Sequence, residues 1–164
     1  LLAILAIGTS GADRAMMFYL LSYSIATICA FGAYIVVAEQ KGDGTFSAFN
    51  GLAKQNSFLA AVLAISMLSL AGIPPLAGFF GKYFLFSAAF VKYPWLVVLA
   101  VINSAISIYY YFKIIIAAYF TKSNEETAGL GQIPVPTGIR LAVLLGLILI
   151  VLMTIMPGSV YSFI

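Results

Sequence analysis

The sequence predicts an all-α protein, a polytopic bundle of transmembrane helices in which one helix is broken by proline and glycine. Hydrophobic residues make up 63% of the chain and charged residues only 8%, against roughly 45–50% and 25% in soluble domains. The apolar residues form continuous runs, whereas the strands of a transmembrane β-barrel alternate apolar and polar residues. Helices are the other structure that satisfies backbone polar groups in lipid.

The length of the chain suits one membrane domain. A spanning helix needs about 20 apolar residues, so 164 residues leave room for about four or five helices. We expect a single domain over residues 1–164, built from the tail of one helix at residues 1–8 and four spans, at about 15–38, 57–91, 95–120 and 138–161. The chain begins inside an apolar run with no charged leader, so we expect a fragment whose N-terminal part is missing rather than a signal peptide.

The apolar stretch at residues 57–91 is too long for one straight helix across a core of roughly 30 Å. A helix break near residues 72–78 resolves this conflict, because proline removes a backbone donor and glycine permits non-helical angles. The residues of the break are Gly72, Pro74, Pro75, Gly78 and Gly81. Ion-coupled transporters place such breaks beside their ion sites, and a kink that only improves packing is the alternative.

Lys82 follows this break within the apolar stretch GIPPLAGFFGKYFLFSAAF. It lies on the order of 12 Å from either interface, too far for its amine to reach the headgroups by snorkelling. A charged lysine at the helix centre costs about 2.5–3.5 kcal/mol, so we expect it to face a wet cavity or a partner. Removing an ammonium from water favours its neutral form, and Lys82 is therefore the predicted proton relay, with packing as the alternative.

A second set of polar residues lies in the span at 95–120. Asn103, Ser107 and Tyr111 are spaced four residues apart and share one helical face, from which they can carry a water chain toward Lys82. Ordinary hydrogen bonds between helices are the alternative explanation. Lys113 is a further candidate for channel lining, with snorkelling to the nearer interface as the equal alternative.

The composition also excludes several functions. The chain has no histidine and one cysteine, Cys29, so it lacks the usual ligand sets for haem, iron–sulfur clusters and zinc. We therefore expect no cofactor and no metal in this chain. The net charge of +3 comes from scattered residues that form no basic patch, which argues against nucleic-acid binding.

The basic residues also predict an orientation, because they stay preferentially on the cytoplasmic side of a membrane. Arg14 and Lys92 fall on one predicted side. Those on the other side are Lys41, Lys54, Lys122 and Arg140. We therefore expect the loops at 39–56 and 121–137 to be cytoplasmic.

Three segments resemble one known family. They are FLAAVLAISMLSLAGIPPLAGFFGKYFLFSAA at 58–89, VINSAISIYYYFKIIIAAYF at 101–120 and YLLSYSIATICAFGAYIVV at 19–37. They are similar to the C-terminal third of the N subunit (subunit 2) of respiratory complex I, one of the antiporter-like membrane subunits. The resemblance implies that Lys82 matches the lysine of the family's broken helix twelve, thought to pass protons to the outside half-channel. The family's glutamate of helix five and lysines of helices seven and eight have no counterpart here.

This resemblance implies a proton-translocating, non-redox subunit of NADH:quinone oxidoreductase that is inactive as an isolated fragment. Its expected partners are the other membrane subunits of complex I, the lipid bilayer and protons, with NAD, flavin, iron–sulfur clusters and quinone in partner subunits. The expected location is the inner (plasma) membrane, as a multi-pass protein. The alternatives are a Mrp-type cation/proton antiporter or membrane-bound hydrogenase subunit, and a structural membrane anchor.

Overall fold

The computed structural model describes residues 11–42, 44–122 and 133–164. These residues form helices and connecting segments without a strand, which confirms the predicted all-α fold. The elements are α2 (Ala12–Lys41), the short 3-10 helix η1 (Phe46–Phe49), α3 (Leu52–Gln55), α4 (Ser57–Ala71), α5 (Ala77–Phe90), α6 (Pro94–Phe120), α8 (Thr137–Ile155) and α9 (Pro157–Phe163). The helix tail predicted at residues 1–8 lies outside the described residues.

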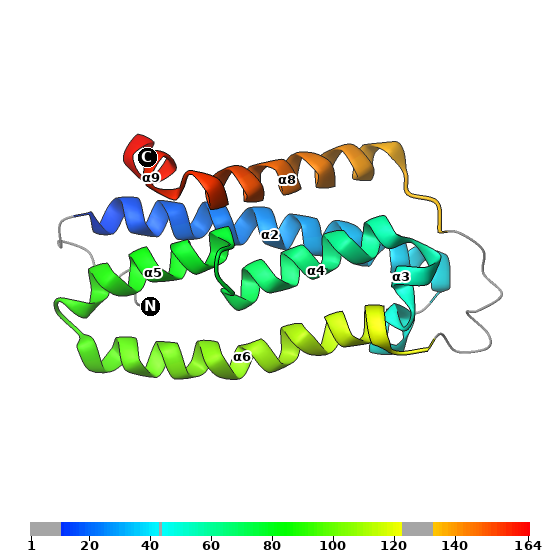
Figure 1. Cartoon of the computed structure of the whole chain (residues 1–164), viewed down its shortest axis with the longest axis horizontal. Helices are drawn as coiled ribbons and strands as arrows, with labels where there is room; N and C mark the ends of the chain where they lie inside the picture. Colours follow the sequence, from blue (N-terminus) through cyan, green and yellow to red (C-terminus); the bar gives the residue numbers. More distant parts are fainter. Residues whose placement is uncertain (1–10, 43, 123–132) are drawn as a thin grey trace.

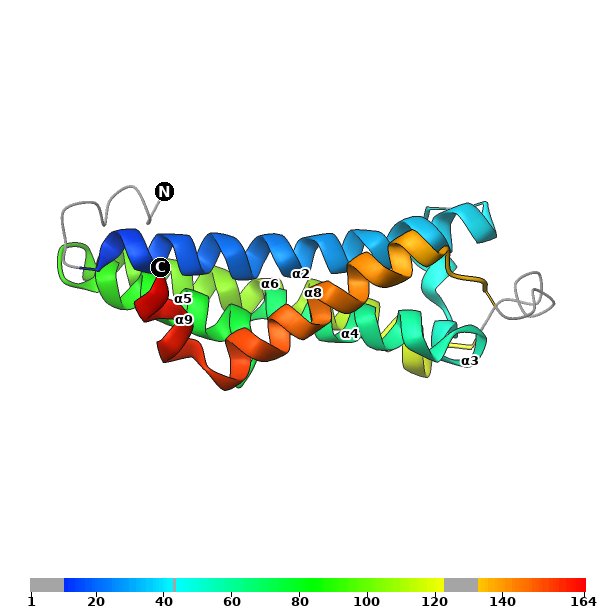
Figure 2. The same cartoon turned by 90° about the horizontal axis from the view of Figure 1, so that it is seen from above.

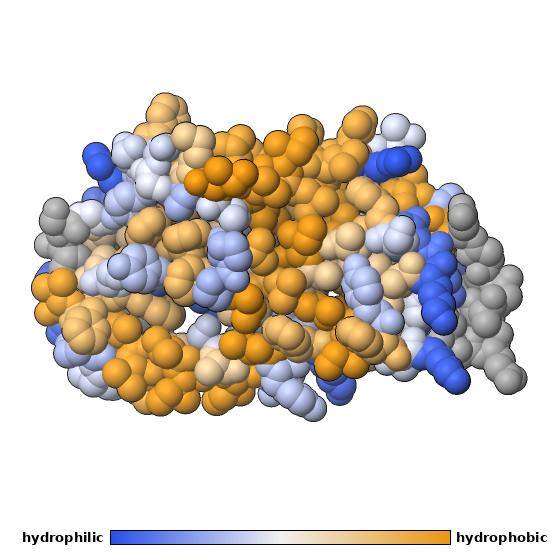
Figure 3. All heavy atoms as spheres, viewed as in Figure 1, coloured by the Kyte–Doolittle hydropathy of each residue, from blue (hydrophilic) through white to orange (hydrophobic). Residues whose placement is uncertain are grey.

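The long helices lie side by side along one axis (Figures 1 and 2). Three of them, α2, α6 and α8, are long and apolar enough to cross a membrane. The shorter α4 and α5 follow one another along the same axis, and the break between them lies near the middle of the bundle (Figure 1). Apolar side chains cover most of the middle of the face in Figure 3, and the most hydrophilic ones lie mainly toward the two ends. The predicted transmembrane bundle with one broken helix is therefore confirmed.

Two helix bounds differ from the sequence-based expectation. The first span was predicted at 15–38, whereas α2 continues to Lys41. The last was predicted as one span over 138–161, but α8 ends at Ile155 and a separate helix begins at Pro157. Proline suits the first position of a helix because its missing N–H has no partner there, and inside a helix it clashes with the preceding turn.

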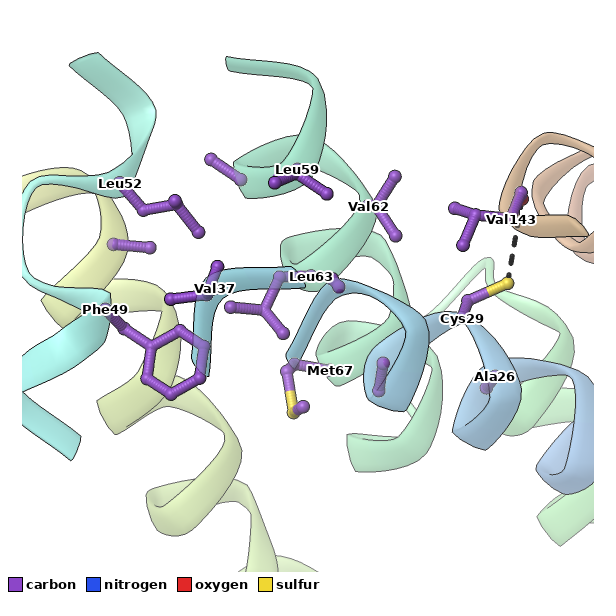
Figure 4. Close-up of a cluster of buried hydrophobic side chains, with 14 of the residues drawn as sticks. Ala26, Cys29, Val37, Phe49, Leu52, Leu59, Val62, Leu63, Met67 and Val143 are labelled. Carbon is purple, nitrogen blue, oxygen red and sulfur yellow. Dashed lines mark hydrogen bonds between the residues drawn. The ribbon is translucent and has the colours of Figure 1, made fainter. Parts of the chain in front are cut away.

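Helix α2 is the centre of the bundle, since it packs against α4, α5 and α8. At the α8 contact the two backbones approach closely because the residues are small, as is common between transmembrane helices. Figure 4 shows Cys29 pointing at α8, where its thiol donates a long hydrogen bond of 3.8 Å to the Val143 carbonyl. A Cβ on Gly146 would overlap the Cys29 sulfur, and a Cβ on Gly32 would lie 2.9 Å from Val143 Cγ2. Both glycines are therefore required by the close packing.

One asparagine anchors the start of α4. The Asn56 side chain accepts a hydrogen bond from the Leu59 N–H at 3.0 Å, and it donates one to the Ile133 carbonyl at 2.8 Å. The first bond is an N-cap, which satisfies a free N–H at the helix start. The second ties α4 to the segment that leads into α8. Because α4 is held at this end, the position of its other end is defined as well.

Replacing Gly146 by valine is expected to separate α2 from α8. The added side chain would collide with Cys29, and overpacking of this kind costs roughly 1–3 kcal/mol. The expected result is a lower midpoint of thermal unfolding in detergent. Gly138→Ala in the same helix is the control, because a Cβ there meets nothing within 4 Å. An unchanged midpoint for Gly146→Val would contradict the described packing.

Candidate functional site

The helix break begins at the C-terminal end of α4, where the N–H groups of Gly72 and Ile73 bond to carbonyls of the last turn. Gly72 takes the left-handed conformation with φ 82°, which glycine tolerates and other residues rarely adopt. Its N–H lies 3.1 Å from the Leu68 carbonyl and 3.0 Å from the Ser69 carbonyl. The Ile73 N–H also bonds the Leu68 carbonyl, at 3.1 Å. The turn therefore satisfies these two carbonyls and none that follows them.

The next two carbonyls of α4 lose their helical partners because of the double proline. In a continuing helix, the carbonyls of Leu70 and Ala71 would accept hydrogen bonds from the N–H groups of residues 74 and 75. Both of these residues are prolines, which have no N–H. The end of α4 thus presents two acceptors in the middle of an apolar bundle, and an unsatisfied backbone group costs several kcal/mol in lipid.

Lys82, the sixth residue of α5, supplies the missing donors. Its Nζ lies 3.0 Å from the Leu70 carbonyl oxygen and 2.9 Å from the Ala71 carbonyl oxygen. A third hydrogen bond, of 2.8 Å, joins it to the Ser104 hydroxyl on α6. The side chain is half-buried, and these three partners in the described part of the chain are all neutral. The C-terminal end of a helix carries partial negative charge, which favours the cationic form of the amine.

Three glycines allow close contacts around the break, two between its ends and one with α2. A Cβ on Gly78 would overlap the Ser69 carbonyl oxygen, and the Gly78 N–H donates to the Ser69 hydroxyl at 3.2 Å. A Cβ on Gly81 would lie 2.7 Å from the Ser22 hydroxyl of α2, and one on Gly72 would lie 3.0 Å from Cδ of the lysine. The helix-break residues of the sequence analysis therefore lie together at this site.

The Lys82 side chain lines two large cavities. A cavity of about 470 Å³ has a mixed polar and apolar lining from α2, α4, α5 and α6. The residues that carry polar side chains in this lining are Tyr19, Tyr23, Lys82, Asn103, Ser104, Ser107 and Tyr111. A second cavity, of about 560 Å³, is mostly apolar and lies mainly between α5 and α6. Lys82 and Ser104 line both cavities.

The structure brings three of the four predicted channel-lining residues to this cavity. Asn103, Ser107 and Tyr111 all line the polar cavity beside Lys82. Lys113 does not line either cavity, because its amine lies over the ring of Phe46, 5.1 Å from the ring centroid. A cation over an aromatic face is stabilised electrostatically, so the structure gives Lys113 a different environment.

Sequence reasoning missed Ser104, which among the described residues is the one side chain whose hydroxyl bonds the lysine amine. The predicted polar face runs from Asn103 at a spacing of four residues, and Ser104 falls outside that series. A spacing of three would have found it, since Ser104, Ser107 and Tyr111 also share a helical face. The Ser107 hydroxyl in fact bonds the Ser104 backbone carbonyl at 2.7 Å.

Gly78→Ala is expected to push α5 away from the end of α4. Its methyl group would occupy the position of the Ser69 carbonyl oxygen, and backbone cannot yield as a flexible side chain does. We expect a loss of roughly 1–3 kcal/mol in stability, measured as a lower unfolding midpoint in detergent. Gly158→Ala is the matched control, because a Cβ there meets nothing within 4 Å. Equal midpoints for the two variants would refute the contact.

The fold and the site together define a class of protein. A transmembrane bundle with a broken helix and an ionisable side chain at mid-depth is typical of membrane proteins that move ions or protons. The chain belongs to the family described as NADH:quinone oxidoreductase/Mrp antiporter, transmembrane, whose sequence profile matches residues 1–107. This match confirms the resemblance inferred from the sequence.

Similar proteins agree with this assignment. The NADH-quinone oxidoreductase subunit N of Cytophaga hutchinsonii is 46% identical over 131 residues, which cover 79% of this chain and 28% of the relative. That of Flavobacterium psychrophilum is 41% identical over 155 residues, covering 93% and 32%. A chain in the structure of respiratory complex I from Thermus thermophilus with bound aureothin superposes with a TM-score of 0.78 and 32% identity, over 98% of this chain and 35% of that chain. This chain therefore spans about a third of the length of the proteins that it matches.

Proposed function

We propose that the chain acts within a proton-translocating membrane subunit of an NADH:quinone oxidoreductase, and that Lys82 takes up and releases the proton. The observation that supports this most is the amine at the middle of the bundle, bonded to two carbonyls of a broken helix and lining a cavity with polar groups. Two acceptors and a helix C-terminus stabilise the charged form, and desolvation favours the neutral form. These opposing effects suit a group that changes its protonation state.

The names of the relatives favour this function over the related ones. The family description covers both quinone oxidoreductases and Mrp antiporters, and a Mrp-type or hydrogenase-linked subunit would share the fold. The first relatives are all named NADH-quinone oxidoreductase subunit N. We therefore propose that other complex I subunits are the partners and that this chain has no redox role. NAD, flavin, iron–sulfur clusters and quinone would belong to those partners, and the isolated chain would be inactive.

The same reasoning extends to location. The relatives are bacterial proteins, so we propose that the bilayer is the plasma membrane. Two basic residues, Arg14 and Lys92, lie at the end of the bundle where α2 begins and α5 ends. Four lie at the opposite end, namely Lys41, Lys54, Lys122 and Arg140. The excess at the second end supports its placement in the cytoplasm.

Lys82→Met in the full-length subunit within its complex is expected to reduce proton translocation at least about 100-fold, the lower end of the range for loss of a positioned proton-transfer group. The measurement is the rate of NADH-driven proton uptake by inverted membrane vesicles, divided by the amount of assembled complex. Lys54→Met removes an exposed lysine at the bundle end and is expected to leave translocation unchanged. A structural anchor predicts that Lys82→Met assembles and translocates normally, and that result would overturn the proposal.

Cysteine labelling tests whether the polar cavity contains water. With Cys29 replaced by alanine, a Ser107→Cys variant is expected to react with a small charged thiol reagent, because the reactive thiolate forms readily only in contact with water. Ile106 lies next to it and is 56% exposed on the surface of α6. In lipid an Ile106→Cys thiol should stay unreactive. Equal labelling of both positions, measured by mass spectrometry in membranes, would contradict a cavity that is wet on one side of α6.

A further inference from the structure

We propose that Ser104 is a positioning residue for proton transfer, because its hydroxyl can stay bonded to the Lys82 amine in both protonation states. The proposal rests on the function proposed for Lys82. Ser104 lies on α6, whereas the other two partners of the amine are backbone carbonyls of α4. The three partners therefore come from two helices and two kinds of chemical group.

The protonated amine is fully satisfied by this arrangement. An ammonium has three N–H donors and no acceptor. The three partners lie between 2.8 and 3.0 Å from Nζ, and each offers a lone pair. Hydrogen bonds from a charged donor are roughly twice as strong as neutral ones. The charged form thus keeps no unpaired N–H, although the site contains no carboxylate partner among the described residues.

The neutral amine requires a hydrogen-bond donor for its lone pair, and among its three partners only the Ser104 hydroxyl can donate. Loss of one proton leaves two N–H donors and one lone pair on Nζ. The carbonyls of Leu70 and Ala71 accept hydrogen bonds but have no proton to donate. A serine hydroxyl both donates and accepts, and its hydrogen rotates to suit its neighbours. After deprotonation the two N–H groups can stay on the carbonyls while Ser104 donates to the lone pair.

The surroundings leave the Ser104 hydroxyl available for this exchange. The neighbouring Ser107 hydroxyl bonds the Ser104 backbone carbonyl at 2.7 Å and makes no competing bond with its hydroxyl. Ser104 and Lys82 line both cavities, so water in a cavity can accept the third proton of the amine, and the hydroxyl then turns to donate to the lone pair left on Nζ. The carbonyls hold the other two N–H groups in place. The third proton, on the side of the hydroxyl, is therefore the one released, and the hydroxyl keeps the amine in place after that proton leaves.

Three substitutions separate the hydroxyl from the volume of the side chain. Ser104→Thr keeps the hydroxyl, and the adjoining cavities leave room for its methyl group. Ser104→Cys keeps a similar volume but offers only a weak donor and acceptor. Ser104→Ala removes both. Thr154→Val is the control, because it removes an intramembrane hydroxyl that bonds the carbonyl of Ile150 within its own helix, at 2.7 Å.

The variants are compared in the full-length subunit within its complex, by proton translocation per assembled complex. Ser104→Ala and Ser104→Cys are expected to fall about tenfold, the factor for one hydrogen bond of ordinary strength. Ser104→Thr and Thr154→Val are expected to stay within twofold of the unmodified protein. A role in packing alone predicts instead that Ser104→Cys, with its similar volume, is tolerated.

Two results would overturn the inference. One is normal translocation by Ser104→Cys or Ser104→Ala, and the other is a threonine variant as impaired as the alanine variant. Lys82→Met, assayed alongside, separates this failure from failure of the proposed function. If Lys82→Met is inactive while the Ser104 variants are normal, only the role of Ser104 is wrong. If Lys82→Met translocates protons normally, the proposed proton-relay function is wrong, and the role of Ser104 that rests on it is wrong too.

Discussion

The site depends on the hydrogen bonds between the Lys82 amine, which is held away from bulk water, and the carbonyls of Leu70 and Ala71, which have no helical donors. Neither component is tolerable alone at this depth. Two unpaired carbonyls would cost several kcal/mol each in lipid, and an unpaired lysine at the helix centre would cost about 2.5–3.5 kcal/mol or more. Bonds of 3.0 and 2.9 Å between them satisfy both. The helix break and the buried lysine are therefore one structural feature.

These hydrogen bonds require the end of α4 and the start of α5 to keep fixed positions relative to each other. Asn56 fixes the start of α4 through its bonds to Leu59 and Ile133. Helix α4 has 15 residues, so the anchored end and the open carbonyls are on the order of 22 Å apart. The absence of a side chain on Gly78 allows α5 to begin against the end of α4, and Gly81 allows it to approach α2. Contacts far from the amine thus define its position.

Much of this was predictable from the sequence because its causes are local. The prolines predict the break, and the apolar length on either side places Lys82 far from the interfaces. The partners of the amine were not predicted, because a donor from α5 and a hydroxyl from α6 meet only after the bundle has folded. The same holds for Lys113, since its contact with Phe46 joins two distant segments. The break at Pro157 was missed because a proline near the end of a span resembles an ordinary helix terminus.

The direction of the broken helix determines which side chain can act there. Helix α4 presents its carbonyl end to the centre of the bundle, and carbonyls can only accept hydrogen bonds. A carboxylate would repel these oxygens, and it would have to remain protonated to bond even one of them. Arginine would supply donors but does not lose its proton in proteins. Lysine supplies donors to both carbonyls and can also lose one proton while keeping two N–H groups. The break therefore favours a residue whose charge can change without loss of its structural bonds.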